Sequence, residues 1–229
     1  RSPMAGFAVE FAGHREYVIG DDPRHVDWRL YYTRDKLFIK QYEMETNFVC
    51  HLVLDVSASM RYGDGESNKL AYAARLATTL GYAIVRQNDK VSLATVDDEV
   101  RGFVPPGQSM AQVHRMAGHL DGVATDRETR LPECLTELAG RTGRRAIVMA
   151  FSDFFCEPDD LEPALQQLRF RDHEVVLFQT LHPDEREFRL GGMTKFVGLE
   201  AAGEELTQAE DIRAGYLAAF AEHTERLDE

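Results

Sequence analysis

The sequence has little of what several common protein classes require. Its 229 residues include only three cysteines, Cys50, Cys134 and Cys156, which are odd in number and far apart. This excludes a disulfide framework and gives no ligand spacing for zinc. No stretch approaches about 18 uninterrupted apolar residues, so no membrane span is predicted in this chain. We expect the thiols to be small buried side chains of a reduced, cytoplasmic protein.

An excess of basic charge is also missing. The chain has 26 Lys and Arg against 39 Asp and Glu, a net charge of −13. This disfavours nucleic acid and anionic membranes as partners, since both need clustered positive charge. The chain begins with Arg1 rather than Met and shows no signal-peptide pattern, so we expect further residues to precede it.

The first part of the chain differs in texture from the rest. Short alternating runs over 7–11 and 37–42 predict half-buried strands, and the Gly, Asp and Pro content of 20–24 predicts a turn between them. We therefore expect residues 1–47 to form a small β-rich extension.

After residue 47 the pattern alternates between apolar strands and amphipathic helices. Apolar runs over 48–54, 91–96, 146–151 and 175–178 predict strands that are buried on both faces. The segments between them have helical periodicity. Residues 48–229 are therefore predicted to form an α/β domain with a doubly wound, mainly parallel sheet.

Oxygen-bearing side chains follow two of the predicted strands. Asp55, Ser57 and Ser59 follow the first strand, and Asp153 follows the strand over 146–151. Ligands bind at the carboxyl ends of strands in such sheets, and carboxylate and hydroxyl oxygens suit Mg²⁺, Mn²⁺ or Ca²⁺. An ion held mainly by neutral hydroxyls keeps positive charge and can take a carboxylate from another molecule.

The run from Asp55 to Ser59 resembles the D-x-S-x-S signature of von Willebrand factor A-type domains, the core of their metal-ion-dependent adhesion site. That family adds a Thr from a later loop and an Asp at the end of a further strand. The resemblance implies Thr129, which stands before Leu131 and Pro132, and Asp153 as these ligands. Thr125 remains an alternative for the threonine.

Segments 14–17, 20–29 and 40–43 are similar to the N-terminal pattern of the bacterial domain of unknown function 58 family. Its members carry a von Willebrand A-like domain after this segment, and the match runs from about Ser2 to Leu227. The family is associated with MoxR-type AAA+ ATPases, which implies an adaptor role. Two departures from the A-domain pattern stand beside the predicted ligands. Phe154 and Phe155 follow Asp153, where many such domains have Gly, and would narrow or shield the site. Arg130 follows Thr129, and its cation would compete with a metal if it pointed inward.

Structural interpretations compete with these. Asp and Ser after a strand also cap helices. Dense charge more often forms an ion-pair network than a partner-binding patch. The charged residues around Trp28 to which this applies are Asp21, Asp22, Arg24, Asp27 and Arg29. We interpret His25 and His51 as packed or surface side chains, and the Arg141, Arg144 and Arg145 cluster as a solvated turn.

Three functions follow from these patterns. The preferred one is a non-enzymatic module that binds a partner's Asp or Glu through the metal. A Mg²⁺-dependent phosphoryl hydrolase with Asp55 as nucleophile is the alternative, although Ser57 stands where such enzymes place a second Asp. A scaffold with an unoccupied site is the third. Residues 199–229 carry nine acidic and two basic side chains. We expect this acidic flank to lie away from the metal face and to attract a basic partner.

Overall fold

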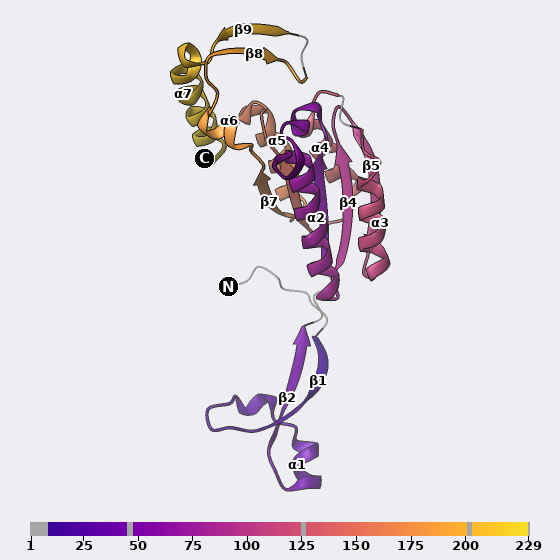
Figure 1. The fold of residues 1–229 in the computed structure, drawn as a ribbon. Coiled ribbons are helices and arrows are strands. Elements are labelled where there is room, and N and C mark those ends of the chain that lie inside the picture. The colour runs from indigo at the N-terminus through magenta and orange to yellow at the C-terminus, as the bar shows by residue number, and fades with distance from the viewer. Residues whose placement is uncertain (1–8, 45–47, 125–126, 201–202, 229) are drawn as a thin grey trace. The chain divides into compact units, whose positions relative to one another are not determined.

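The computed structural model describes residues 9–44, 48–124, 127–200 and 203–228, and Figure 1 follows the course of the chain. The chain divides into two units, Arg1–Asn47 and Phe48–Glu229. The first unit is referred to below as the extension, and each unit is described by itself.

The extension is a two-stranded antiparallel sheet with a helical connection. Strand β1 (Val9–Glu16) pairs with β2 (Phe38–Met44), and a 3-10 turn, η1 (Pro23–His25), and helix α1 (Trp28–Arg34) lie between them. The strands and the turn were predicted from the sequence, whereas the helix was not. Helix α1 begins after Asp27, whose carboxylate accepts hydrogen bonds from the backbone N–H groups of Arg29 and Leu30 at 3.0 and 3.3 Å. This is N-cap chemistry.

The charged residues of the extension bond to one another. Arg15 donates two hydrogen bonds of 2.8 Å to Asp21, and Arg24 donates to Asp22 at 2.7 Å. These arginines lower the pKa values of the Asp21 and Asp22 carboxyls. The structural interpretation of these acidic residues is therefore confirmed.

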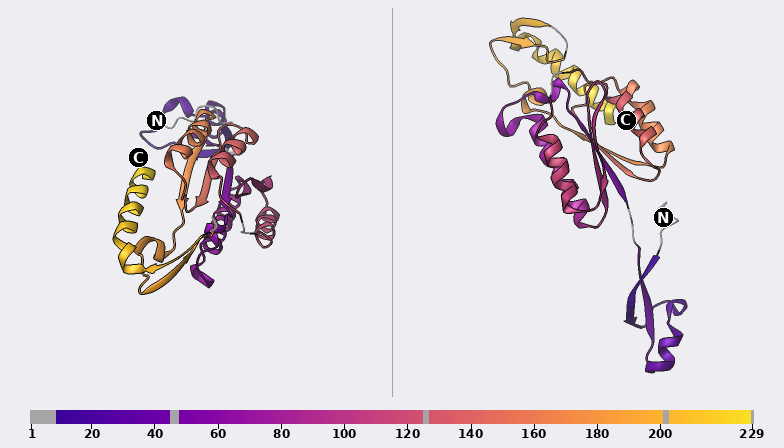
Figure 2. Two further views of the ribbon diagram at one scale, coloured as in Figure 1. Left: turned by 90° about the horizontal axis from the view of Figure 1, so that it is seen from above. Right: turned by 90° about the vertical axis from the view of Figure 1, so that its right-hand side faces the viewer.

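The second unit is built on a five-stranded sheet. Its order is β5-β4-β3-β6-β7, with parallel pairing except at the β5 edge. The strands are β3 (Val49–Asp55), β4 (Lys90–Val96), β5 (Val100–Gly107), β6 (Ile147–Ser152) and β7 (Glu174–Gln179). This mainly parallel α/β architecture confirms the predicted fold class, and Figure 2 shows the sheet from two further sides.

Helices cover both faces of the sheet. They are α2 (Lys69–Arg86), α3 (Met110–Leu120), α4 (Leu131–Arg141) and α5 (Pro158–Phe170). Leu52 belongs to the core with α2 and α3, whereas its neighbour Val53 belongs to the core with α4 and α5. Successive strand residues point to opposite faces, which is why β3 reads as a continuous apolar run. Ala73 and Ala77 of α2 are fully buried, and their small side chains let the helix lie close to the sheet.

The C-terminal part continues from β7 through the short helix α6 (Pro183–Glu187). Strands β8 (Met193–Val197) and β9 (Glu204–Gln208) then pair antiparallel as a hairpin, and helix α7 (Ala209–Asp228) follows. Figure 1 shows the hairpin and α7 in orange and yellow. Within the described residues, no helix combines the length and apolar character needed to cross a bilayer.

The positions of Cys50, Cys134 and the arginine cluster agree with the structural roles expected for them, and Cys156 is less buried than expected. Cys50 and Cys134 are buried and Cys156 is half-buried. Burial raises the pKa of Cys50 and Cys134 to about 12 and that of Cys156 to about 11, so these thiols are poor nucleophiles near neutral pH. Arg144 is exposed and pairs with Asp172 at the surface, at 3.3 Å.

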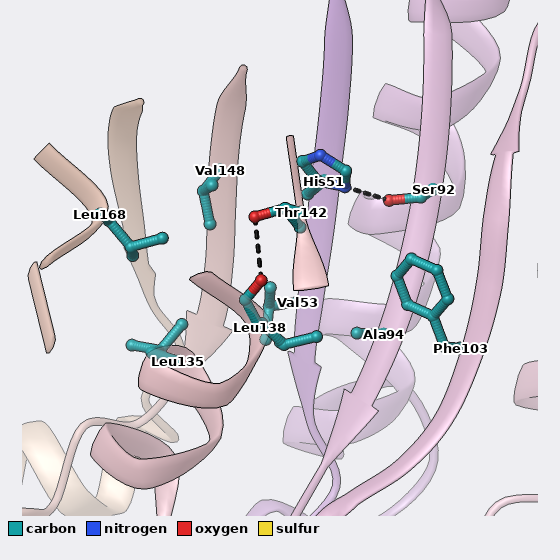
Figure 3. A pocket seen from close by; sticks show the side chains of 10 residues that line it. All are labelled: His51, Val53, Ser92, Ala94, Phe103, Leu135, Leu138, Thr142, Val148 and Leu168. Atoms are coloured by element: carbon teal, nitrogen blue, oxygen red, sulfur yellow. Dashed lines mark hydrogen bonds between the residues drawn. The ribbon is translucent and has the colours of Figure 1, made fainter. Parts of the chain in front are cut away.

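A buried polar group lies at the amino ends of the strands. Its side chains, called the amino-end cluster below, are His51, Ser92, Thr142 and His173. Figure 3 shows the His51 Nδ1–Ser92 Oγ bond, at 2.6 Å, beside a cavity of about 10 Å³. His173 Nδ1 accepts from the backbone N–H of Ala146 at 3.1 Å. Burial lowers the pKa of His51 to about 4, so both its contacts and its charge state are those of a packed histidine.

Candidate metal centre

The two predicted acidic strand ends lie at one edge of the sheet. Strands β3 and β6 are neighbours and parallel, with Leu54 opposite Phe151. Asp55 ends β3, and Asp153 directly follows β6. Because parallel strands end on the same side, both carboxylates lie at the carboxyl edge of the sheet. The polar side chains gathered there are called the carboxyl-end site below.

Asp55 is the most enclosed member of the site, with no exposed surface. Its Oδ1 accepts from the backbone N–H of Ser57 at 2.9 Å. Its Oδ2 accepts from the hydroxyls of Ser152 and Thr129, at 2.6 and 3.2 Å. Burial raises the pKa of Asp55 to about 6; the bonds from Ser152 and Ser57 oppose this, and the charge of Asp153 adds to it. Asp55 is therefore a buried carboxylate held by neutral donors.

The hydroxyls come from two loops that are tied together. Ser57 and Ser59 follow β3, and their Oγ atoms lie 3.1 Å apart. A 3-10 turn, η2 (Ala58–Arg61), begins here, and the N–H of Ala58 donates to the carbonyl of Arg127 at 2.8 Å. This bond holds the serine loop against the loop that carries Thr129. Asp55, Ser57, Ser59 and Thr129 are thus brought together through hydrogen bonds between their own atoms.

The two uncertainties about the threonine loop have different outcomes. Arg130 is exposed, and its backbone N–H donates to the carbonyl of Asp97 at 2.8 Å, directly before α4. Its cation therefore does not fill the site. Thr125, the alternative threonine, lies outside the described residues.

Asp153 has a partner that sequence reasoning missed. Its Oδ2 accepts from Nζ of Lys69 at 2.8 Å, and its Oδ1 accepts from the N–H of Phe155 at 3.3 Å. The same Nζ donates to Oε1 of Glu185 at 2.6 Å and lies 5.5 Å from the centre of the Phe155 ring. Lys69 is only 1% exposed, so its charge is enclosed by groups that compensate it. Asp153 is therefore already engaged with a cation of the chain.

A signal for Lys69 exists in the sequence, although it is weak. Lys69 is the first residue of α2, and Asn68 caps that helix with its side chain. A cation at a helix N-terminus is disfavoured by the helix dipole. A lysine in that position therefore suggests a nearby carboxylate, but the sequence does not say which one.

Glu200 reaches the site from the C-terminal part of the chain. Its Oε1 accepts from the N–H of Ser59 and its Oε2 from the N–H of Thr129, both at 3.3 Å. The expectation that the acidic stretch over 199–229 lies away from the metal face is therefore wrong for Glu200. Glu200 and Ser59 are separated by 141 residues in the sequence, and no local pattern encodes their contact.

The donor set fits a hard divalent cation. With Mg–O bonds of about 2.0–2.1 Å at right angles, neighbouring ligand oxygens lie about 2.9 Å apart. The Ser57–Ser59 hydroxyl pair is separated by 3.1 Å, and Thr129 Oγ1 lies 3.2 Å from Asp55 Oδ2. Among the described residues, no group of three or more His, Cys, Asp and Glu could hold a metal. A metal here would therefore depend on hydroxyl oxygens, as the resemblance implies.

A sequence profile decides the family. The profile described as "Protein of unknown function DUF58" matches residues 13–226. The chain belongs to the DUF58 family. Among proteins with curated descriptions, none is significantly similar in sequence to this DUF58 chain.

Solved structures resemble this DUF58 chain to different degrees. An aerotolerance-related membrane protein from Bacteroides fragilis NCTC 9343, with multiple mutations to serines, is 15% identical with a TM-score of 0.52, over 79% of this chain and 98% of that one. BatB, a conserved hypothetical protein from Bacteroides thetaiotaomicron, is 15% identical with a TM-score of 0.48, over 76% and 87%. The VWA domain of SpRpn10 is 13% identical with a TM-score of 0.39, over 58% and 88%. The first of these likenesses supports the fold.

Phe154 explains how the DUF58 chain departs from the A-domain pattern after Asp153. Its φ is +54°, a left-handed conformation that favours glycine. Its side chain is 2% exposed and belongs to the core cluster that includes Leu161 of α5. Its N–H donates to Oγ of Ser152 at 3.0 Å. Burial of the ring therefore offsets the cost of the backbone conformation, and Phe154 does not shield the site.

Proposed function

We propose that this DUF58 chain is a non-enzymatic protein-interaction module that binds its partner through a divalent metal ion, Mg²⁺ or else Mn²⁺ or Ca²⁺. The observation that carries the proposal is the set of hydroxyl and carboxylate oxygens of Asp55, Ser57, Ser59 and Thr129, at separations suited to octahedral ligands. These four side chains would hold the ion. Asp153, already paired with Lys69, would add negative charge beside it.

The ion would supply an electrophilic point for a carboxylate. Asp55 contributes one negative charge and the hydroxyls none, so a bound divalent ion keeps positive charge toward the open side. An Asp or Glu of a partner suits such a position. Ser152, whose hydroxyl is 2.6 Å from Asp55 Oδ2, orients that carboxylate.

The enclosure of Asp55 supports binding over phosphoryl transfer. A carboxylate nucleophile needs an open line of attack on phosphorus. Asp55 has no exposed surface, and both its oxygens accept hydrogen bonds. A group held in this way is suited to ligating an ion.

Thermal unfolding tests the metal site. An ion that binds only the folded state at 100 times its Kd stabilises by about 2.7 kcal/mol, or roughly 5–10 °C in a domain of this size. We expect Mg²⁺ or Mn²⁺ to raise the Tm by this amount in the wild type, and the rise to vanish in Asp55→Asn, which keeps the side-chain shape. No rise in the wild type, or an equal rise in the variant, would count against the site.

The proposed partner is an AAA+ ATPase of the MoxR type, which rests on the family resemblance. A partner should present a carboxylate to the metal and basic groups to the acidic residues of 199–229. Binding of a purified ATPase of this type should weaken on chelation of metal and in Asp55→Asn. Equal binding with and without metal would leave the metal without a role in this interaction.

A further inference from the structure

Glu200 lies where an incoming carboxylate would approach the site. Each of its oxygens accepts one backbone N–H, from Ser59 and from Thr129, at 3.3 Å. The hydroxyls of these same two residues are predicted ligands. The backbone N–H groups of Ser59 and Thr129 come from two separate loops and lie next to the predicted hydroxyl ligands. Together they can donate to both oxygens of one carboxylate.

A second carboxylate cannot share this position. Two carboxylates would compete for the same two N–H donors and would repel each other. A partner's Asp or Glu that reaches the rim of the site therefore has to displace Glu200.

The contacts of Glu200 allow displacement. Both of its bonds are long for N–H···O bonds, which are commonly about 2.9–3.0 Å. The hairpin that carries the Glu200 loop leaves apolar side chains exposed on both strands, with Met193 at 62%, Val197 at 55% and Leu206 at 63%. An isolated two-stranded hairpin is only marginally stable in water.

The base of the hairpin is anchored more firmly than its loop. Phe196 stacks on Phe188 with ring centres 6.2 Å apart, and the N–H of Ala209 donates to the carbonyl of Gly192 at 3.0 Å. Strands β8 and β9 pair with each other and with no strand of the central sheet. Glu200 can therefore leave the site without disturbing that sheet.

We propose that Glu200 is a built-in competitor, which occupies the carboxylate position of the carboxyl-end site until a partner's Asp or Glu replaces it. The inference rests on the proposed metal-dependent function and adds its regulation. It implies that the site is self-inhibited, and that the Glu200 carboxylate leaves the Ser59 and Thr129 amides when a partner binds.

Backbone NMR of the chain with sodium acetate as probe, at saturating Mg²⁺ and constant ionic strength, tests this. The amide signals of Ser59 and Thr129 report on the position directly. If Glu200 fills it nine-tenths of the time, its removal raises apparent acetate affinity about tenfold. We expect this gain in Glu200→Ala, and wild-type affinity in Glu205→Ala, which removes an exposed carboxylate from the same hairpin.

The outcomes separate the two proposals. In the first contradicting outcome, acetate binds the wild type and Glu200→Ala equally or binds neither. If Mg²⁺ still shifts these amides in both proteins but not in Asp55→Asn, the competition is overturned and the metal site is not. Absence of any Mg²⁺-dependent shift in the wild type and in Glu200→Ala would overturn the metal site and the competition with it.

Discussion

The two ends of the parallel strands carry buried polar groups of similar enclosure and different chemistry. At the amino end, the buried side chains of His51 and Ser92 form a hydrogen bond with each other, and both groups are neutral. At the carboxyl end, Asp55 and Asp153 are as deeply buried, but they are acidic side chains rather than neutral ones. Burial alone therefore does not distinguish a structural cluster from a candidate site.

The difference lies in how each end balances its donors and acceptors. The neutral hydroxyl and imidazole groups of the amino-end cluster satisfy one another by hydrogen bonds. The cavity beside them, of about 10 Å³, is correspondingly small (Figure 3). At the carboxyl end, the side chains described there include more carboxylates than cations, with Asp153 and Glu185 sharing Lys69. Surplus buried negative charge needs a further cation. Uncompensated charge, rather than burial, therefore distinguishes the carboxyl-end site from the amino-end cluster.

The largest expected effect is at Lys69. Lys69→Met leaves the buried carboxylate of Asp153 without its ammonium, and breaking a buried pair in this way costs about 3–5 kcal/mol. We expect a loss of this size in urea unfolding. Lys195→Met is the control, because Lys195 pairs with Glu204 at the surface and such pairs contribute about 1 kcal/mol or less. Equal losses in both variants would show that the Lys69 pair has no special weight.

The next effect is the acid sensitivity of the amino-end cluster. The pKa of His51 is lowered from 6.5 to about 4 by burial, so between these pH values the unfolded chain binds more protons than the folded one. The contribution of neutral His51 to the free energy of unfolding is fully present above about pH 6.5. It falls by about 3 kcal/mol as the pH drops to 4.

Comparison with His51→Gln isolates this loss. Asp55, whose pKa is raised to about 6, acts in the opposite direction over the same range. The free energy of unfolding, measured in chelator from pH 8 to 4, should therefore fall more steeply in the wild type than in the variant. At pH 8 the two should differ only by a constant, and parallel curves throughout would contradict the assignment.

The smallest expected effect separates the two ends most sharply. Ser152→Ala and Ser92→Ala each remove a buried hydroxyl with one short bond, at 2.6 Å, and should each cost about 1–2 kcal/mol. Only Ser152 holds a proposed metal ligand, so Mg²⁺ affinity should fall roughly tenfold in Ser152→Ala. Calorimetric titration of both variants measures this. A similar loss of affinity in Ser92→Ala would erase the distinction between the ends.

Much of the sheet could be predicted because its central strands are buried on both faces. The apolar runs over 48–54, 91–96 and 146–151 correspond to β3, β4 and β6. The run over 175–178 does correspond to β7, but the expectation that it is buried on both faces is wrong, because β7 lies at the edge of the sheet and Val176 is 40% exposed. Strand β5 carries Pro105 and Pro106 near its end, which suits its place at the edge but hides its strand character in the sequence. Helix α1 was missed because it is seven residues long and lacks buried residues to give it a period.

The candidate site could be predicted where its members follow strands or match the motif of the resembling family. Asp55 and Asp153 were found from strand ends, and Thr129 from the family resemblance. Lys69, Glu185 and Glu200 come from a helix start, a short helix and a hairpin loop, and they reach the site only through tertiary packing. Sequence separations of 71 to 141 residues divide these bonded pairs. No local periodicity or motif spans such distances.

Phe154 joins the site to the interior. Its left-handed backbone follows Asp153 directly, and its ring is held in the core that includes α5. A glycine at position 154 would adopt the same conformation freely. Because glycine has no side chain in the core, the packing there could change without moving the Asp153 carboxylate. With phenylalanine, a substitution that loosens the packing also releases the turn that positions Asp153. In this chain the position of Asp153 at the edge of the sheet therefore depends on how well the interior packs around Phe154.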